Sequence, residues 1–135
     1  MKPLFLAALL LATSATARPP EMRGTEWVLV EMNGKPVAPI PRVTLTLGKD
    51  GRMNGASGCN RFMGGYELRG GSMTVPGPVA GTMMACTPEA MAFEDAYLTQ
   101  LKKGGRVRVS WEGNMRITPD GGGQLRFRAD VPAPK

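Results

Sequence analysis

The stretch Arg106–Ala129, RVRVSWEGNMRITPDGGGQLRFRA, decides the fold class, because apolar and polar residues alternate along it with period two. Such alternation is typical of β-strands that bury one face. The turn sequences Glu112-Gly113 and Asp120–Gly123 interrupt it twice, so we expect three antiparallel strands joined as a meander. The inward face is expected to carry Val107, Val109, Trp111, Met115, Ile117, Leu125, Phe127 and Ala129.

Turn signals and one helix pattern organise the rest of the chain. Asn33-Gly34 and Asp50-Gly51 each follow an apolar stretch and suit tight hairpin turns, in which both central residues take positive φ. Two further short strands are expected around Gly70-Gly71, at 64–68 and 72–75. Between Thr87, a candidate N-cap, and Gly104, the spacing predicts a helix. Its apolar stripe comprises Ala90, Phe93, Tyr97 and Leu101, which we assign to core packing.

Residues 1–17 have the pattern of a secretory signal peptide. A positive charge at Lys2 precedes the apolar run Leu4–Ala12, and an A-x-A site predicts cleavage after Ala17. The alternative, an N-terminal membrane anchor, needs about 20 apolar residues, roughly twice the length of this run. We therefore expect an exported, periplasmic chain that begins at Arg18 and has no transmembrane segment.

The cysteine positions refine that expectation. The first cysteine is Cys59, far from the cleavage site, so no cysteine is available there for lipid attachment and the exported chain is expected to be soluble. In an oxidising compartment, Cys59 and Cys86 are expected to form a structural disulfide, with two free buried thiols as the alternative. Residues 18–24 are expected to form a linker, 25–129 the folded domain, and 130–135 a disordered tail.

Composition excludes several classes of function. The chain has 135 residues, a formal net charge of +6, two cysteines and no histidine. Without histidine there is no imidazole base, no Ser-His or Cys-His nucleophile pair and no histidine-ligated metal. Ser57 lies in Gly55–Cys59, but a nucleophile elbow needs glycine where Cys59 stands. No catalytic residue, cofactor site or metal site is therefore predicted, and the protein is not expected to be an enzyme.

The outward face of the meander carries five arginines: Arg106, Arg108, Arg116, Arg126 and Arg128. Arginine binds phosphate and carboxylate groups through paired hydrogen bonds, so this face is a possible anion-binding site for an envelope polymer. The simpler interpretation is a solvated face that keeps the protein soluble and blocks edge pairing. Nucleic acid is not an expected partner, because the chain is predicted to leave the cytoplasm and only 6% of its residues are aromatic.

Two other clusters have competing interpretations. Glu94 and Asp95 are adjacent on the expected helix and are assigned to its solvated surface. The residues Met83, Met84, Cys86 and Met91 gather near the helix start. Their soft sulfur atoms suit Cu(I), but we assign the methionines to gap-filling core packing.

The segment Gly55–Tyr66 resembles the META-domain, or HslJ-like, family. The family pattern has a Gly-x-x-Gly-Cys-Asn element, a Gly-x-Tyr, and a Thr-x-Met-Ala-Cys element before a helix with a glutamate. In this chain the matching positions are Gly55, Gly58, Cys59, Asn60, Tyr66, Thr82, Met84, Ala85, Cys86 and Glu89. The opening at 24–29, the turn at 33–37 and Asp50–Arg52 match as well, so the resemblance covers about residues 24–129.

The resemblance implies a mainly β (α+β) fold, a small antiparallel barrel-like unit with one packed helix. It implies a bacterial envelope protein linked to stress such as heat shock, with no established enzymatic activity. We therefore expect a stress-related binding module whose partner is an envelope protein or an anionic envelope polymer. The alternative is a chaperone-like or structural aid to envelope integrity without a defined ligand. The motif residues are expected to be structural: Gly55 and Gly58 for unusual backbone conformations, and Asn60 for a turn.

Overall fold

The computed structural model describes residues 18–130, together with Pro3 and Leu11. Apart from those two residues, the expected signal peptide and its cleavage site after Ala17 lie outside the described residues, as does the expected tail beyond Asp130. Within the described part of the chain, no helix has the length and hydropathy needed to cross a membrane.

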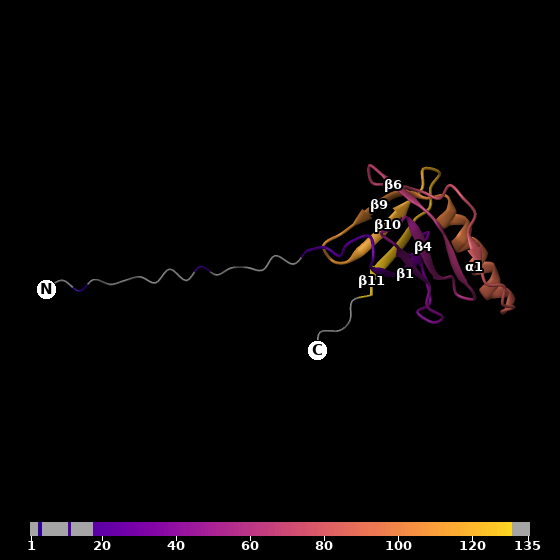
Figure 1. The fold of residues 1–135 in the computed structure, drawn as a ribbon. Coiled ribbons are helices and arrows are strands. Elements are labelled where there is room, and N and C mark those ends of the chain that lie inside the picture. Colours follow the sequence, from indigo (N-terminus) through magenta and orange to yellow (C-terminus); the bar gives the residue numbers. More distant parts are fainter. Residues whose placement is uncertain (1–2, 4–10, 12–17, 131–135) are drawn as a thin grey trace.

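The fold is one curled antiparallel sheet, and a single helix among the described residues packs against it (Figure 1). The hydrogen-bonded order of the strands is β6-β7-β9-β10-β11-β1-β3-β4-β5-β8, and β2 pairs with β1 outside this path. This half-barrel with one helix confirms the expected fold class. The strands are β1 (Glu26–Met32), β2 (Lys35–Pro36), β3 (Thr44–Leu47), β4 (Arg52–Ala56), β5 (Arg61–Gly65), β6 (Glu67–Arg69), β7 (Ser72–Thr74), β8 (Ala80–Gly81), β9 (Gly105–Val109), β10 (Asn114–Thr118) and β11 (Leu125–Ala129).

The meander predicted from the opening stretch is confirmed as β9, β10 and β11, which pair antiparallel in sequence order. The expected position of Trp111 is wrong. Strand β9 ends at Val109, and Trp111 lies in the turn before β10, where its side chain is 70% exposed. The period-two alternation continued past the end of the strand, so the pattern alone placed the indole inside.

One of the two predicted hairpin turns has the expected geometry. Asn33 and Gly34 both have positive φ, 54° and 81°, and they connect β1 to β2. The β3–β4 connection is a longer loop from 48 to 51, and only Gly51 of the Asp50-Gly51 pair has positive φ. The Asp50 carboxylate instead accepts a hydrogen bond from the Arg52 backbone N–H (3.0 Å), which closes the turn without left-handed backbone at Asp50.

Helix α1 (Pro88–Lys102) begins as its sequence predicts. The Thr87 hydroxyl caps it by accepting the Ala90 N–H (3.2 Å), Pro88 takes the first turn, and Glu89 complements the helix dipole. Its stripe faces the sheet, with Tyr97 and Leu101 fully buried and Phe93 half-buried. The helix therefore closes the open side of the curled sheet.

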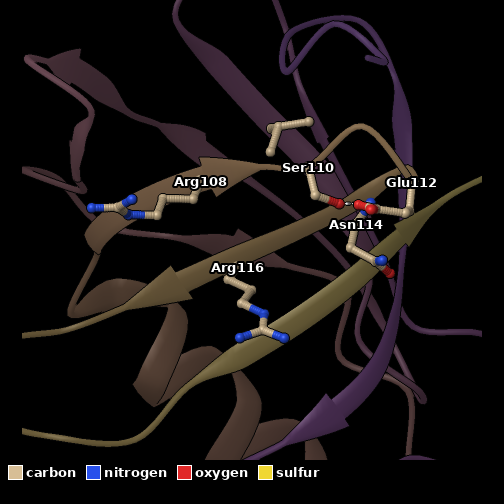
Figure 2. A pocket seen from close by; sticks show the side chains of 6 residues that line it. Arg108, Ser110, Glu112, Asn114 and Arg116 are labelled. Atoms are coloured by element: carbon tan, nitrogen blue, oxygen red, sulfur yellow. Dashed lines mark hydrogen bonds between the residues drawn. The ribbon is translucent and has the colours of Figure 1, made fainter. Parts of the chain in front are cut away.

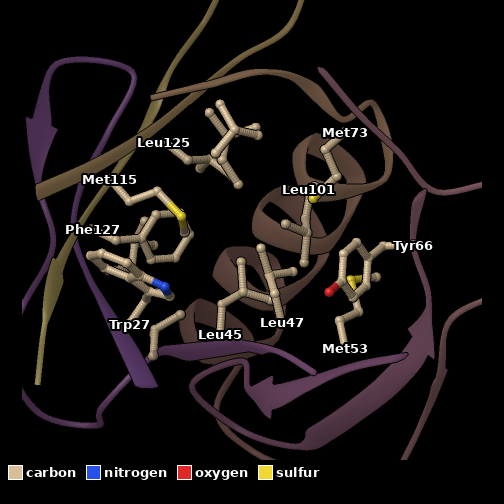
Figure 3. Packing of buried hydrophobic residues seen from close by; sticks show 14 of the residues in the cluster. Trp27, Leu45, Leu47, Met53, Tyr66, Met73, Leu101, Met115, Leu125 and Phe127 are labelled. Carbon is tan, nitrogen blue, oxygen red and sulfur yellow. The ribbon is translucent and has the colours of Figure 1, made fainter. Parts of the chain in front are cut away.

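The core fills the space between the sheet and α1 (Figure 3). Trp27 is fully buried, and its indole N–H donates to the Met22 carbonyl (3.0 Å), so the buried polar atom is satisfied. Met22 itself packs against the core, although the sequence placed it in a linker. The largest fully buried side chains are Trp27, Leu45, Leu47, Met53, Met73, Tyr97, Leu101, Met115, Ile117, Leu125 and Phe127.

Gly55 is required for close packing and not for an unusual backbone conformation. It is absent from the positive-φ glycines, but a Cβ atom there would lie 2.0 Å from the Thr44 carbonyl oxygen. Gly58, by contrast, has a φ of 98°, as expected. The two motif glycines thus meet different constraints, one steric between β3 and β4 and one conformational in the loop after β4.

Replacing Gly55 with alanine is expected to lower the free energy of unfolding by about 2–3 kcal/mol, because strands β3 and β4 must separate to admit the methyl group. Gly77→Ala is the matched control, since nothing lies within 4 Å of a Cβ there and its φ is not positive. Urea denaturation of both variants measures the difference. Equal midpoints for the two would contradict the steric role of Gly55.

Candidate functional site

Asn60 is the centre of a polar joint between three segments. Its backbone N–H and its Nδ2 donate to the two carboxylate oxygens of Glu94 on α1, at 2.8 and 2.9 Å. Its Oδ1 accepts the Met84 backbone N–H (2.7 Å) and the Thr82 hydroxyl (3.0 Å). Asn60 is only 8% exposed. One side chain therefore ties the loop after β4 to the helix and to the segment that precedes the helix.

Ser57 completes this motif joint, which we define as Ser57, Asn60, Thr82 and Glu94. Its hydroxyl is fully buried and donates to Glu94 Oε1, while also lying 2.9 Å from the Asn60 carbonyl oxygen. The assignment of Glu94 to the solvated helix surface is therefore wrong, whereas its neighbour Asp95 is exposed. Helical spacing placed Glu94 beside Ala90 and Tyr97 but gave no sign of the polar loop opposite.

Hydrogen bonding outweighs burial in setting the ionisation of Glu94. Partial burial alone raises the pKa of its carboxyl, but the hydrogen bonds from the Ser57 hydroxyl, the Asn60 amide and the Asn60 backbone N–H together hold that pKa below its usual value. Glu94 is therefore a carboxylate at neutral pH, and the joint is held by charge-assisted hydrogen bonds.

A disulfide closes the joint on one side. Cys59 and Cys86, the pair expected from the sequence, are bonded in the structure, with Cα atoms 6.1 Å apart. The bridge ties the residue before Asn60 to the residue before the helix cap, Thr87. The Gly-Cys-Asn and Met-Ala-Cys elements thus form one structural unit.

The other motif residues are placed as follows. Tyr66 is buried and its hydroxyl donates to the Gly48 carbonyl, and burial raises the pKa of the phenol. The Thr82 hydroxyl also accepts the Arg61 backbone N–H (3.0 Å). Ala85 and Glu89 are exposed. Asn60 was expected to serve a turn, but it does not have the positive φ of a left-handed turn, and its amide oxygen instead accepts a hydrogen bond from the distant Met84 backbone.

The structure aligns three of the five predicted arginines. Arg108 on β9 lies directly opposite Arg116 on β10, and Arg116 lies directly opposite Arg126 on β11. We call Arg108, Arg116 and Arg126 the arginine row. Directly opposed residues in antiparallel strands have Cα atoms about 4.5–5.5 Å apart, so the register sets three like-charged residues side by side, which is unfavourable for a sheet.

One acidic residue continues the row. Glu31 on β1 lies opposite Arg126, and their side chains form an ion pair at 3.0 Å. Within the part of the chain that the structure describes, no ion pair involves Arg108 or Arg116. The row therefore ends in two exposed guanidinium groups on adjacent strands.

The remaining two arginines flank the row at opposite ends of the face. Arg128 is opposite Asn114, toward the β9–β10 turn, and Arg106 is opposite Thr118 and Ser72 at the far end. A shallow hollow of about 500 Å³ lies between Arg108, Arg116 and the turn (Figure 2). Glu112 borders this hollow, and its pKa is lowered by hydrogen bonds from its own backbone N–H and from Ser110.

The methionines near the helix start are not in the core. Met83 is 97% exposed, Met84 59% and Met91 45%, so their assignment to gap-filling packing is wrong. The joint fixes the backbone of this segment by hydrogen bonds to Asn60, and those bonds leave the thioethers outside. Cys86 is held in the disulfide and is not available as a thiolate.

The chain belongs to the META domain family, whose model matches residues 20–132. It is 27% identical over 107 residues to heat shock protein HslJ of Escherichia coli strain K12, covering 79% of this chain and 76% of that protein.

Solved structures share the fold. A protein from Burkholderia xenovorans studied by NMR is 28% identical, with a TM-score of 0.65, over 89% of this chain and 97% of that one. Another NMR structure is 26% identical, with a TM-score of 0.61, over 77% and 87% of the two chains. A DUF4847 family protein from Bacteroides vulgatus, at 13% identity and a TM-score of 0.57 over 79% and 93% of the two chains, shares the fold alone.

Glu94→Gln is expected to lower the free energy of unfolding at neutral pH by about 2 kcal/mol, because an amide cannot accept all the hydrogen bonds that the carboxylate accepts. The folded-state pKa of Glu94 lies below its ordinary value of 4.5, so its contribution is present above pH 4.5 and is lost as pH falls through the folded pKa. Urea midpoints measured from neutral pH downward should therefore draw together for the variant and the parent as the pH falls below 4.5. Asp95→Asn, the exposed control, should match the parent at every pH. A gap that does not narrow as the pH falls would contradict the role of the carboxylate.

Reduction of the Cys59–Cys86 bridge is expected to lower the free energy of unfolding by about 3–4 kcal/mol, as the chain-entropy model gives for a 27-residue separation. Intact mass after alkylation without reductant should show no labelled thiol. The Cys59→Ser/Cys86→Ser double variant controls for the reductant, since its stability should not respond. Two labelled thiols in the untreated protein would overturn the bridge.

Proposed function

We propose that this chain is an exported, non-enzymatic envelope protein that binds an anionic envelope polymer through the arginine row. The observation that carries the proposal is the direct opposition of Arg108 and Arg116 on neighbouring strands without an acidic partner in the described residues. Opposed like charges destabilise a sheet, and a bound phosphate or carboxylate would relieve that repulsion.

The exposed indole of Trp111 supports the same surface. It lies in the β9–β10 turn, next to the residues that border the hollow beside Arg108 and Arg116. An exposed aromatic ring in the turn that borders the hollow offers apolar contact area next to an electrostatic site. A polymer with phosphate groups on a sugar or lipid framework, such as lipopolysaccharide, offers both kinds of contact.

Export and a stress-related role rest on other observations. The pattern of residues 1–17 and the disulfide both fit an oxidising compartment outside the cytoplasm. The name of the E. coli relative, heat shock protein HslJ, supports a role under stress. The absence of histidine from the sequence and the complete burial of Ser57 support a role without catalysis.

A second candidate function, assistance to unfolded envelope proteins, is favoured by exposed apolar side chains. Ile40 is 85% exposed and Trp111 70% exposed. Recognition of apolar chains would be insensitive to moderate salt, whereas binding of a polyanion to arginine weakens as ionic strength rises.

The Arg108→Ser/Arg116→Ser variant is expected to lose most of its affinity for lipopolysaccharide and to show a weaker dependence on salt. In nucleic-acid complexes, removal of one cationic side chain that contacts a phosphate lowers the slope of log affinity against log salt by about one. We expect the same reduction for each of these two arginines that contacts a phosphate of the polymer. Because Trp27 is buried and Trp111 is exposed, a change in tryptophan emission on binding would report on the surroundings of Trp111.

Arg52→Ser/Arg69→Ser is the matched control. It removes the same charge from exposed positions on β4 and β6 and leaves the arginine row intact. Equal losses in the two double variants would attribute binding to net charge and contradict the proposal. Binding that ignores salt and both substitutions would favour the second candidate.

A further inference from the structure

We propose that Met83, Met84 and Met91 form a binding site for a soft monovalent metal ion, Cu(I), between strand β8 and the first turns of helix α1. We call these three residues the methionine site. They border one surface hollow of about 310 Å³, beside the motif joint. The site is independent of anion binding, because it is built on α1 and the segment after β8 and not on β9–β11.

The three methionine side chains of this site are exposed, which is unusual for methionine. Methionine is among the residues most often buried, and burial of its side chain is worth about 1.5–3 kcal/mol. Met53, Met73 and Met115 are buried in this way. The methionines exposed among the described residues are Met63, Met83, Met84 and Met91, and three of these four gather at one hollow.

The backbone on both sides of the hollow is fixed. The Met84 N–H is held by Asn60 Oδ1 at 2.7 Å, and the disulfide at Cys86 anchors the same segment two residues later. Met91 stands in the first turns of α1, where its N–H bonds to the Thr87 carbonyl (3.0 Å). Three flexible thioethers thus project from two positioned pieces of backbone, which limits the entropy lost when they converge on an ion.

The chemistry of the donors selects the metal. Thioether sulfur is neutral and soft, and it favours Cu(I) over Zn²⁺ or Mg²⁺. The neighbouring cysteines are bonded to each other, so the thioethers are the soft ligands at this place. Glu94 also borders the hollow, but its oxygens accept hydrogen bonds from Asn60 and Ser57. It contributes a nearby negative charge that favours a cation.

Ag(I), a redox-inert analogue of Cu(I), tests the site in the oxidised protein. Titration of protein carrying ¹³C-methyl methionine should saturate at one equivalent and shift the methyl signals of Met83, Met84 and Met91. Cu(I) supplied without a competing chelator under anaerobic conditions should bind in the same stoichiometry. Zn²⁺ should leave the methyl signals unchanged, and Zn²⁺ binding with equal shifts would overturn the assignment to soft ligands.

The triple variant Met83→Leu/Met84→Leu/Met91→Leu keeps an apolar surface and removes all three sulfur atoms. Because the three thioethers are the proposed ligands, their loss should abolish the one-equivalent binding of Ag(I) and Cu(I). Met63→Leu is the matched control, because Met63 is also exposed but borders a different hollow. Unchanged affinity in the triple variant, or equal weakening by Met63→Leu, would overturn the proposal. Urea midpoints of both variants verify that the fold and its disulfide persist.

Discussion

The hydrogen bonds between Asn60 and Glu94 are the constraint on which the arrangement of this molecule depends. A half-barrel sheet leaves one side open, and a helix must be held there at a defined angle and height. Apolar packing of Tyr97 and Leu101 attracts the helix but is not directional. The Asn60 amide and backbone N–H fix it by bonding both oxygens of one carboxylate.

That joint also determines what the surface displays. Asn60 Oδ1 holds the Met84 backbone, so the chain between β8 and α1 runs across the joint and not into the core. Met83 and Met84, which lie in this segment, therefore face solvent. The disulfide adds a covalent tie to a contact that the hydrogen bonds already specify, so it stabilises the joint more than it defines it. Asn60 and Thr82 of the family motif both act within this joint.

The sequence was informative for the meander and for the start of the helix, where a local rule operated. Period-two alternation predicted the β9–β11 meander, and capping residues predicted the start of α1 at Pro88. It failed where the deciding partner was distant in the chain. The sequence around Glu94 does not reveal that Asn60, more than thirty residues earlier, donates hydrogen bonds to its carboxylate. Gly55 needs its missing side chain because of Thr44, on another strand. The predicted burial of Trp111 was wrong for a different reason: alternation does not show where a strand ends, and β9 ends at Val109.

The arginine row and the methionine site differ in how much of each could be predicted from the sequence. The arginine face followed from alternation alone, but its division into an opposed row and two flanking residues needed the strand register. The strand register sets Arg108 beside Arg116, and neither has an acidic partner in the described chain. Arg126, next in the row, is paired with Glu31. A merely solubilising face gains nothing from such opposition, since dispersed arginines would serve solubility with less repulsion. The cost of placing Arg108 against Arg116 is the physical reason to favour a bound anion over a solvated face.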